Sequence, residues 1–352
     1  FFYGWVIVAL CFLVTLTAAG IRSAPSVLIQ PLEAEFSWSR GGIATAASLN
    51  LLLFGVGAPI SGWLLDSFGL RRVVLGSLGL LAIGVGGTIF MEELWQLVLL
   101  WGIVAGLGAG ATPVLGAFVA NRWFVARRGL ALGVLANGVA AGQMVFLPVL
   151  MAVTVAAGWR GSSLLMASFA FALMLLVALW MRDDPSDIGL GPYGTSDRTS
   201  ALPGLSSAES VVSGAVGVSS VMDAFRSPTF WLLCGCFFVC GVTANGLIGT
   251  HLIPHVIERG IPKLTAAATV GVMGGISFVG TLFSGWMVDR VDPRKVLAFV
   301  YALRGSTLFI LPYVNDFSGL LVFAVIYGLD WFASGPGTVT IPADTFGRRA
   351  VG

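Results

Sequence analysis

Three charged side chains lie within long apolar runs of this 352-residue chain: Arg22, Arg304 and Asp330. A charge in the interior of a bilayer costs about 2.5–3.5 kcal/mol on insertion scales, so each of the three needs a function or a partner. A guanidinium can donate two parallel hydrogen bonds to a carboxylate. Arg22 is therefore a candidate for binding an acidic solute. The alternative is an arginine that reaches out to the membrane surface.

Arg304 and Asp330 fall at similar depth in two successive apolar runs that would cross a membrane in opposite directions. We predict an ion pair that fixes the position of the two helices, in which Asp330 could also titrate. Direct binding of substrate by Arg304 is the alternative. His251 and His255 lie one helical turn apart. Imidazole changes charge near neutral pH, so both are candidates for proton coupling; a structural role at the membrane surface is the alternative.

Neutral polar side chains within apolar runs form a second set of candidates for substrate binding. They are Asn50, Asn137, Gln143, Asn245 and Thr281. Each could instead bond a neighbouring helix. Catalytic residues, metal ligands and cofactors are not predicted, because the chain has two histidines, and its four cysteines are typical of buried thiols. A phosphate-binding G-x-x-x-x-G-K loop is also absent from the sequence, which argues against ATP as the energy source.

The elements that would position these side chains are membrane-spanning helices. Hydrophobic residues make up 57% of the chain and charged residues 10%, against about 25% charged in soluble domains. Apolar runs of about 20 residues can each cross a bilayer as a helix. We predict ten such spans: 4–29, 40–66, 71–91, 94–121, 129–157, 160–181, 228–257, 264–288, 295–313 and 317–345.

A polar stretch rich in Ser, Gly and Asp separates six of these spans from the other four. It predicts an N-terminal six-helix bundle over residues 1–182, a linker over 183–226 and a C-terminal bundle over 227–352. Of the 19 Lys and Arg residues, thirteen fall in the loops of one side and four in those of the other. By the positive-inside rule the first side, with the N-terminus and the linker, is cytoplasmic.

A motif recurs at the end of the second span of each half. Gly62-Trp63-Leu64-Leu65-Asp66 and Gly285-Trp286-Met287-Val288-Asp289 both read G-W-x-x-D, and two basic residues follow each after four intervening positions. Such a repeat is what a transporter with two related halves requires. The charged residues of the motif are candidates for a cytoplasmic gate, with generic surface charge as the alternative: Asp66, Arg71, Arg72, Asp289, Arg294 and Lys295.

These residues also resemble a known family. The first motif resembles the loop motif of the major facilitator superfamily. The stretch 122–133, R-W-F-V-A-R-R-G-L-A-L-G, resembles a signature of its monocarboxylate-transporter-like and oxalate:formate-antiporter-like members. The resemblance implies an all-α membrane protein with twelve helices in two bundles around a cavity that opens alternately to each side. On this expectation ten of the twelve helices are present, and the natural start and the last two helices lie outside the sequence.

One departure from the family concerns the eighth span. The resembling carriers place a cavity arginine four residues before the second motif's glycine, where this chain has Thr281. Arg22 could take over that role, or the substrate could be a weaker acid or a neutral molecule.

The function predicted is secondary transport of a small organic solute, a monocarboxylate or related acid, with or without protons. The alternative is an exporter of a drug-like or neutral solute. A membrane enzyme is disfavoured because it would need His or acidic clusters near a membrane face, and a transporter-like sensor without flux stays open. The expected partners are a small-molecule substrate and the lipid bilayer, without nucleic acid. We expect a monomer in the cytoplasmic (inner) membrane.

Overall fold

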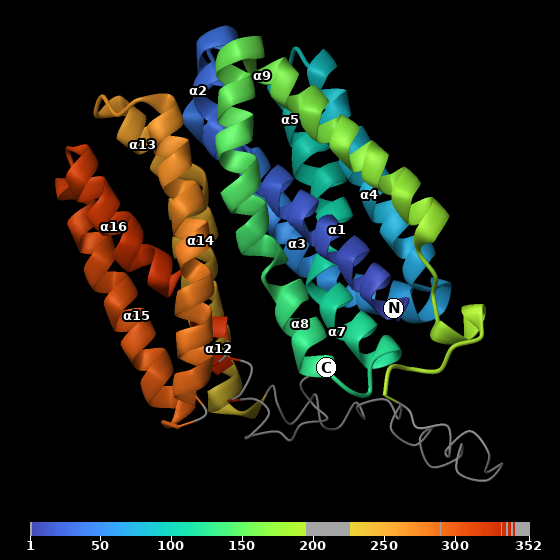
Figure 1. Cartoon of the computed structure of the whole chain (residues 1–352). Coiled ribbons are helices and arrows are strands. Elements are labelled where there is room, and N and C mark those ends of the chain that lie inside the picture. The colour runs from blue at the N-terminus through green and yellow to red at the C-terminus, as the bar shows by residue number, and fades with distance from the viewer. Residues whose placement is uncertain are drawn as a thin grey trace.

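Long apolar helices build the chain (Figure 1). The computed structural model describes residues 2–194, 226–288, 290–331, 333–335, 337, 338 and 341. The elements are α1 (Gly4–Ser23), α2 (Pro25–Phe36), α3 (Arg40–Phe68), α4 (Leu70–Gly87), η1 (Thr88–Phe90), α5 (Leu94–Leu97), η2 (Val98–Ala105), α6 (Gly106–Ala109), α7 (Thr112–Trp123), α8 (Arg128–Ala136), α9 (Gly138–Trp180), η3 (Pro185–Ile188), α12 (Pro228–Cys240), η4 (Gly241–His251), α13 (Leu252–Glu258), α14 (Lys263–Val288), α15 (Pro293–Ile310), η5 (Leu311–Tyr313) and α16 (Phe317–Asp330). The predicted all-α class is confirmed.

Within the described residues, eight helical stretches are long and apolar enough to cross a membrane. One of them, Leu130–Trp180, turns back on itself at Gly158, whose φ of 73° and ψ of 176° are not helical. It therefore supplies two legs, 138–157 and 159–180, which Figure 1 shows in green. A shorter apolar helix, α16, follows the eight. The molecule is a multi-pass membrane protein.

Several helix boundaries differ from those predicted. The first helical stretch continues past residue 29 to Phe36, because Pro25 stands at the start of α2, where its missing N–H costs no hydrogen bond. The tenth helix, α16, is bounded at Asp330; beyond it residues 334, 335, 337, 338 and 341 are helical, and the predicted residues 332, 336, 339, 340 and 342–345 lie outside the described part of the chain. Two spans predicted as plain α-helix contain π-helical segments, η2 and η4, whose wider turns are common at functional sites.

The two halves of the chain pack against each other along α9 and α14, which lie side by side in Figure 1. Gly271 and Gly274 face α9 so closely that a Cβ on either would come within 3.1 Å of a backbone oxygen there. In lipid no hydrophobic effect drives helices together, and small residues permit the close backbone contact that replaces it. The contact is apolar, and it fixes where the halves meet.

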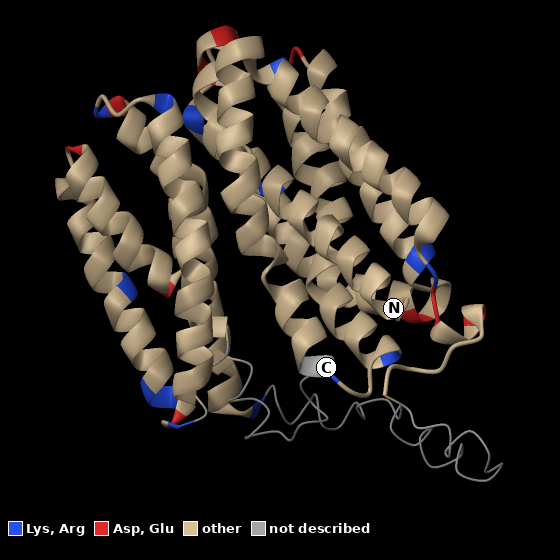
Figure 2. Cartoon of the chain, viewed as in Figure 1, with Lys and Arg blue, Asp and Glu red and all other residues tan. Residues whose placement is uncertain are grey.

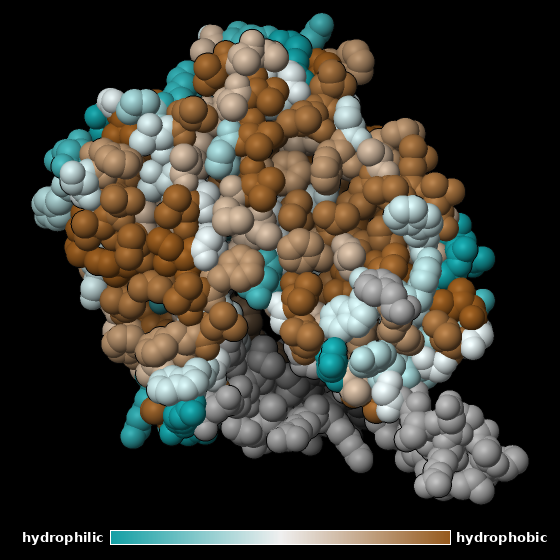
Figure 3. Space-filling model, viewed as in Figure 1, coloured by the Kyte–Doolittle hydropathy of each residue, from teal (hydrophilic) through white to brown (hydrophobic). Residues whose placement is uncertain are grey.

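Charged side chains gather at the two ends of the helices, while the middle is largely uncharged (Figure 2). The face shown in Figure 3 carries a broad apolar surface between these ends. We call the end that holds Arg71, Arg122 and the N-terminus the Arg71 end. The other, where α2 approaches α13 and where Arg40 and Arg160 lie, we call the Arg40 end. The apolar surface between them is what contact with lipid tails requires.

Residues 183–194, at the start of the predicted linker, are fastened to the Arg71 end of the first half. Asp184 pairs with Arg122, with 2.7 Å between the carboxylate and the guanidinium Nε. The backbone N–H of Tyr193 donates to the carbonyl of Trp123, and the Tyr193 carbonyl accepts from Val125 and Ala126. This segment therefore joins the loop between α7 and α8 to the end of α9. The predicted linker residues 195–225 lie outside the described part.

The turn between α3 and α4 depends on Gly69. Its φ of 82° and ψ of 164° fall in a region that is essentially restricted to glycine. A Cβ at this position would lie 2.8 Å from Oδ1 of Asp183, and that same oxygen accepts the backbone N–H of Arg71 at 2.7 Å. Asp183 thus satisfies a free N–H in the first turn of α4, and glycine leaves the room for it.

We predict that Gly69→Ala destabilises the protein by about 1–3 kcal/mol, because backbone strain adds to the displacement of Asp183. Thermal unfolding of the purified protein in detergent measures this. Gly62→Ala is the matched control in the same motif, since a Cβ there meets nothing within 4 Å and the backbone is helical. Equal melting temperatures for the two variants would contradict the proposed role of Gly69.

Candidate functional site

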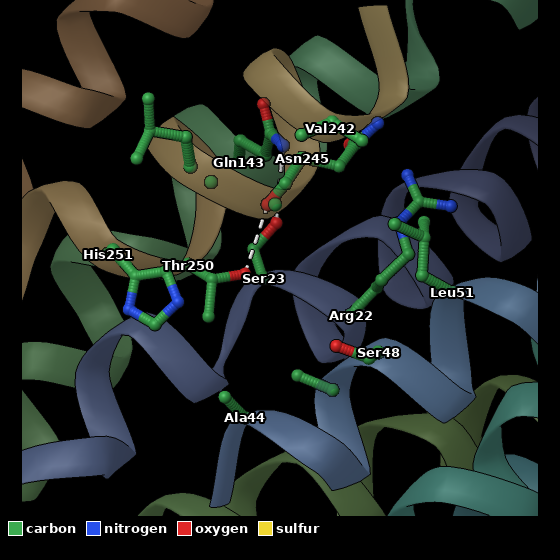
Figure 4. A pocket seen from close by; sticks show the side chains of 14 residues that line it. Arg22, Ser23, Ala44, Ser48, Leu51, Gln143, Val242, Asn245, Thr250 and His251 are labelled. Atoms are coloured by element: carbon green, nitrogen blue, oxygen red, sulfur yellow. Dashed lines mark hydrogen bonds between the residues drawn. The ribbon is translucent and has the colours of Figure 1, made fainter. Parts of the chain in front are cut away.

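A cavity of about 240 Å³ lies between the two halves of the chain (Figure 4). Its walls come from the end of α1, from α3, from one residue of α9 and from the π-helical segment η4. The described lining residues are Arg22, Ser23, Ala44, Ala47, Ser48, Leu51, Gln143, Val242, Asn245, Gly246, Leu247, Gly249, Thr250 and His251. Both halves contribute, so movement of one half relative to the other would change the cavity.

Arg22 supplies the fixed positive charge of this wall, and the described lining includes no Asp or Glu. Between described residues, its guanidinium makes no hydrogen bond or ion pair; its carbon lies 4.2 Å from the centroid of the Phe54 ring. A cation over an aromatic face is stabilised by about 0.5–2 kcal/mol. The donors of Arg22 thus remain available for an anion that enters the cavity.

Uncharged polar groups line the rest of the wall. Gln143 Nε2 donates to Ser23 Oγ at 3.2 Å, which joins α9 to α1 beside Arg22 (Figure 4). The Thr250 hydroxyl donates to the carbonyl of Asn245, five residues earlier, at 3.0 Å, so it satisfies a π-helical carbonyl next to the cavity. The cavity thus combines one cation with amide and hydroxyl groups and two glycines of η4, Gly246 and Gly249.

The structure places only some of the predicted substrate-binding residues in this cavity. Arg22, Gln143 and Asn245 line it together; Asn50, Asn137 and Thr281 are not among its described lining residues. The Asn50 amide donates to the Trp101 carbonyl within π-helical η2, Asn137 to the Gly133 carbonyl at the break between α8 and α9, and the Thr281 hydroxyl to the Ser277 carbonyl. All three hydrogen bonds therefore satisfy helix backbone.

Three hydroxyl residues of the cavity escaped the sequence reasoning: Ser23, Ser48 and Thr250. Ser23 directly follows Arg22, and Thr250 directly precedes His251. For Ser23 and Thr250, this position next to an ionisable candidate was a signal in the sequence, whereas Ser48 has no such neighbour. Ser and Thr inside membrane helices commonly bond their own backbone, so residue type alone does not mark a site.

The two candidate histidines differ in position. His251, the last residue of η4, lines the cavity, whereas His255 lies one turn later on α13 and is not among the described lining residues. Nε2 of His255 is buried without a hydrogen-bond partner in the described structure. His251 is therefore the histidine that a bound solute could contact.

Arg304 and Asp330 face each other inside the second half. Nε of Arg304 donates to Oδ2 of Asp330 at 2.6 Å, and Nη2 donates to the backbone carbonyls of Asp330 and Trp331 at 3.0 Å each. Both side chains are about 1% exposed or less. The pair joins α15 to the end of α16, and neither residue lines the cavity between the halves. The predicted ion pair is therefore present, and its role in fixing the position of the two helices stays a prediction.

The described halves share one ion pair, and it lies at the Arg40 end. Arg40, at the start of α3, donates through Nε and Nη2 to both carboxylate oxygens of Glu33 on α2. Its Nη2 also lies 2.5 Å from Oε1 of Glu258, the last residue of α13. Ala44, one turn along α3 from Arg40, and His251, directly before α13, line the cavity. The ion pair therefore joins α3 of the first half to α13 of the second half, just outside the cavity at the Arg40 end.

The motif residues lie at the opposite, Arg71 end. Arg71 is bound within the first half: its backbone N–H donates to Asp183, and its guanidinium donates to the carbonyl of Ala178. Asp66, Arg72, Arg294 and Lys295 are exposed. Asp289 lies outside the described residues. Between described residues, these motif groups make no ion pair across the two halves, and their role in a gate stays a prediction.

The architecture of two helical halves around a shared polar cavity defines a class, the polytopic membrane transporters. Comparison with known proteins gives the family. The family model "Major Facilitator Superfamily" matches residues 10–352. The chain belongs to the major facilitator superfamily. The family and the similar curated proteins are transporters, not enzymes.

Curated relatives and solved structures agree with this assignment. Monocarboxylate transporter 12-B of Danio rerio is 24% identical over 364 residues, covering 99% of this chain and 75% of its own. Monocarboxylate transporter 11 of Homo sapiens is 28% identical over 342 residues, covering 93% and 67%. The bacterial homologue of the lysosomal transporter Spinster, inward-facing and unoccupied, has a TM-score of 0.72 at 17% identity, covering 99% and 78%. A D-xylose-proton symporter has a TM-score of 0.71 at 13% identity, covering 99% and 86%.

For the buried ion pair we predict strong coupling. Asp330→Asn leaves the Arg304 charge buried without a counter-charge, which typically costs about 3–5 kcal/mol. In the double variant Arg304→Gln, Asp330→Asn no charge is left, so it should lose less than the sum of the two single losses. Melting temperatures of the three variants in detergent measure this, with exposed Arg290→Gln as the control. Additive losses would show that the two charges do not depend on each other.

Proposed function

We propose that this chain transports a small organic acid across the cytoplasmic membrane by alternating access. The proposal rests chiefly on Arg22, a cation without a described hydrogen-bond acceptor in a cavity with no described acidic lining residue. A monocarboxylate would neutralise this charge and take two of its hydrogen bonds. Both curated relatives described above carry the name monocarboxylate transporter, which supports the same class of substrate.

The size of the cavity favours a small solute. Sites for drug-sized molecules span about 300–1,000 Å³, and the cavity here is about 240 Å³. The amide and hydroxyl groups around Arg22 could bind the remaining polar atoms of such an acid. A drug-sized cargo would exceed this volume, and a neutral cargo would leave the charge of Arg22 without a counter-charge.

Alternating access fits the way in which the halves are joined. An apolar, glycine-lined contact runs along α9 and α14, and the one cross-half ion pair of the described residues lies at the Arg40 end. We infer that this state is closed at the Arg40 end, which the distribution of basic residues predicts to be extracellular. The transporter would act as a monomer, since each chain contains both walls of the cavity.

Arg22→Gln tests the substrate class. We expect it to abolish most uptake of acetate, L-lactate, pyruvate, oxalate or benzoate, whichever the wild type carries into proteoliposomes, while folding is retained by gel filtration. Running the assay with and without a pH gradient shows whether protons move with the acid. Arg290→Gln, an exposed arginine outside the cavity, is the control. Uptake of these acids that is undiminished in Arg22→Gln would refute the assignment.

Glu258→Gln tests closure at the Arg40 end. In this variant Arg40 still pairs with Glu33 and loses only its contact to the second half. An exposed ion pair is worth about 0.2–1 kcal/mol, so we expect the population of states open at this end to rise about 1.4- to 5-fold. Labelling of Ala47→Cys, in a background without native cysteines, by an impermeant maleimide added from the Arg40 side measures the shift.

Glu92→Gln is the matched control for Glu258→Gln, because Glu92 is an exposed carboxylate between α4 and α5 and belongs to one half. If Glu258→Gln labels no faster than Glu92→Gln, the ion pair does not hold the halves closed.

A further inference from the structure

Two arginines inside the protein are stabilised in different ways. The hydrogen bonds of Arg304 go to a carboxylate oxygen and two carbonyl oxygens, all in its own half. Arg22 has no oxygen acceptor among the described residues; the ring of Phe54 lies 4.2 Å from its guanidinium carbon. Arg304 thus uses Nε and Nη2 within its own half and leaves Nη1 without a partner among the described residues, whereas none of the Arg22 donors has an oxygen partner there.

An aromatic ring is well suited to hold an arginine that must still bind an anion. The negative face of the ring attracts the cation, but it offers no oxygen to the N–H groups. A carboxylate in the same place would occupy those groups and compete with the substrate. Phe54 therefore gives Arg22 a stable position without consuming its hydrogen-bonding capacity.

The location of Phe54 fits this role. It lies on α3 three residues after Leu51, so it continues the helix face whose residues Ala44, Ala47, Ser48 and Leu51 line the cavity. Its ring is half-buried against the core. Arg22 comes from the last turn of α1, so the contact also links two helices of the first half beside the cavity.

We propose that Phe54 is a positioning residue, which holds the Arg22 guanidinium ready for the carboxylate of the substrate. A flexible arginine loses rotamer freedom when it binds, and holding it in place beforehand lowers the cost of binding. The effect should therefore appear in KM rather than in the maximal rate. This inference rests on the proposed function, because it assumes that Arg22 binds the substrate carboxylate.

The test is the kinetics of uptake into proteoliposomes, for whichever of acetate, L-lactate, pyruvate, oxalate and benzoate the wild type carries. We expect Phe54→Leu to raise KM about three- to tenfold, with the maximal rate changed less than about twofold. Phe54→Tyr and Phe54→Trp restore a ring face and should keep KM near the wild-type value. In an Arg22→Gln background, Phe54→Leu should have no further effect on residual uptake.

Phe118→Leu is the matched control. Its ring also lies under an arginine, with 4.9 Å from the Arg122 guanidinium carbon to the ring centroid, but Arg122 is already paired with Asp184. This variant should leave KM unchanged. The inference is wrong if Phe54→Leu leaves KM unchanged, or if Phe54→Trp raises it as much as Phe54→Leu does. Should Arg22→Gln itself leave uptake intact, or the wild type carry none of the five acids, the proposed function fails and this inference fails with it.

Discussion

The apolar contact between α9 and α14 is the constraint on which the rest of the architecture depends. Gly271 and Gly274 bring the second half against the α9 backbone, and no hydrogen bond joins α14 to α9 among the described residues. The cavity, with one wall from each half, exists where it does because of this contact. A smooth contact between small residues can change its angle at low cost, whereas a network of hydrogen bonds would have to break. The ion pair between Arg40 and Glu258 is exposed to solvent and joins the halves at the Arg40 end.

Charge in an apolar interior is treated in two opposite ways here. Arg304 donates through Nε and Nη2 to Asp330 and to the backbone at the end of α16, so these donors join α15 to α16, and its Nη1 has no hydrogen-bond partner among the described residues. Arg22 is left without an oxygen partner among the described residues. The free-energy cost of burying a charge does not by itself distinguish the two arginines. The difference between structure and function lies in which neighbours occupy their N–H groups.

Much of the fold was predictable, because apolar length and the recurring G-W-x-x-D motif report directly on membrane helices and on the two halves. Within the candidate site, Arg22, Gln143 and Asn245 were recognisable since a charge or an amide in an apolar run is costly. The π-helical turns of η2 and η4 leave no comparable mark in the sequence. Asn50 and Thr281 stay candidates from the sequence alone, since in the described structure they donate to helix carbonyls and do not line the cavity. Arg40 and Glu258, 218 positions apart, meet only through the packing of the halves.

Arg22, the one fixed charge among the described lining residues of the cavity, has an electrical consequence. An empty cavity carries the positive charge of Arg22, whereas a cavity that holds a monoanion is neutral. A charge moved across the whole membrane field gains or loses about 2.3 kcal/mol per 100 mV. If the guanidinium crosses part of that field as the halves rock, voltage biases the return of the unloaded carrier and leaves the loaded step nearly unaffected. The membrane potential would then determine to which side the cavity of the empty carrier opens, and it would exert little force on the loaded carrier.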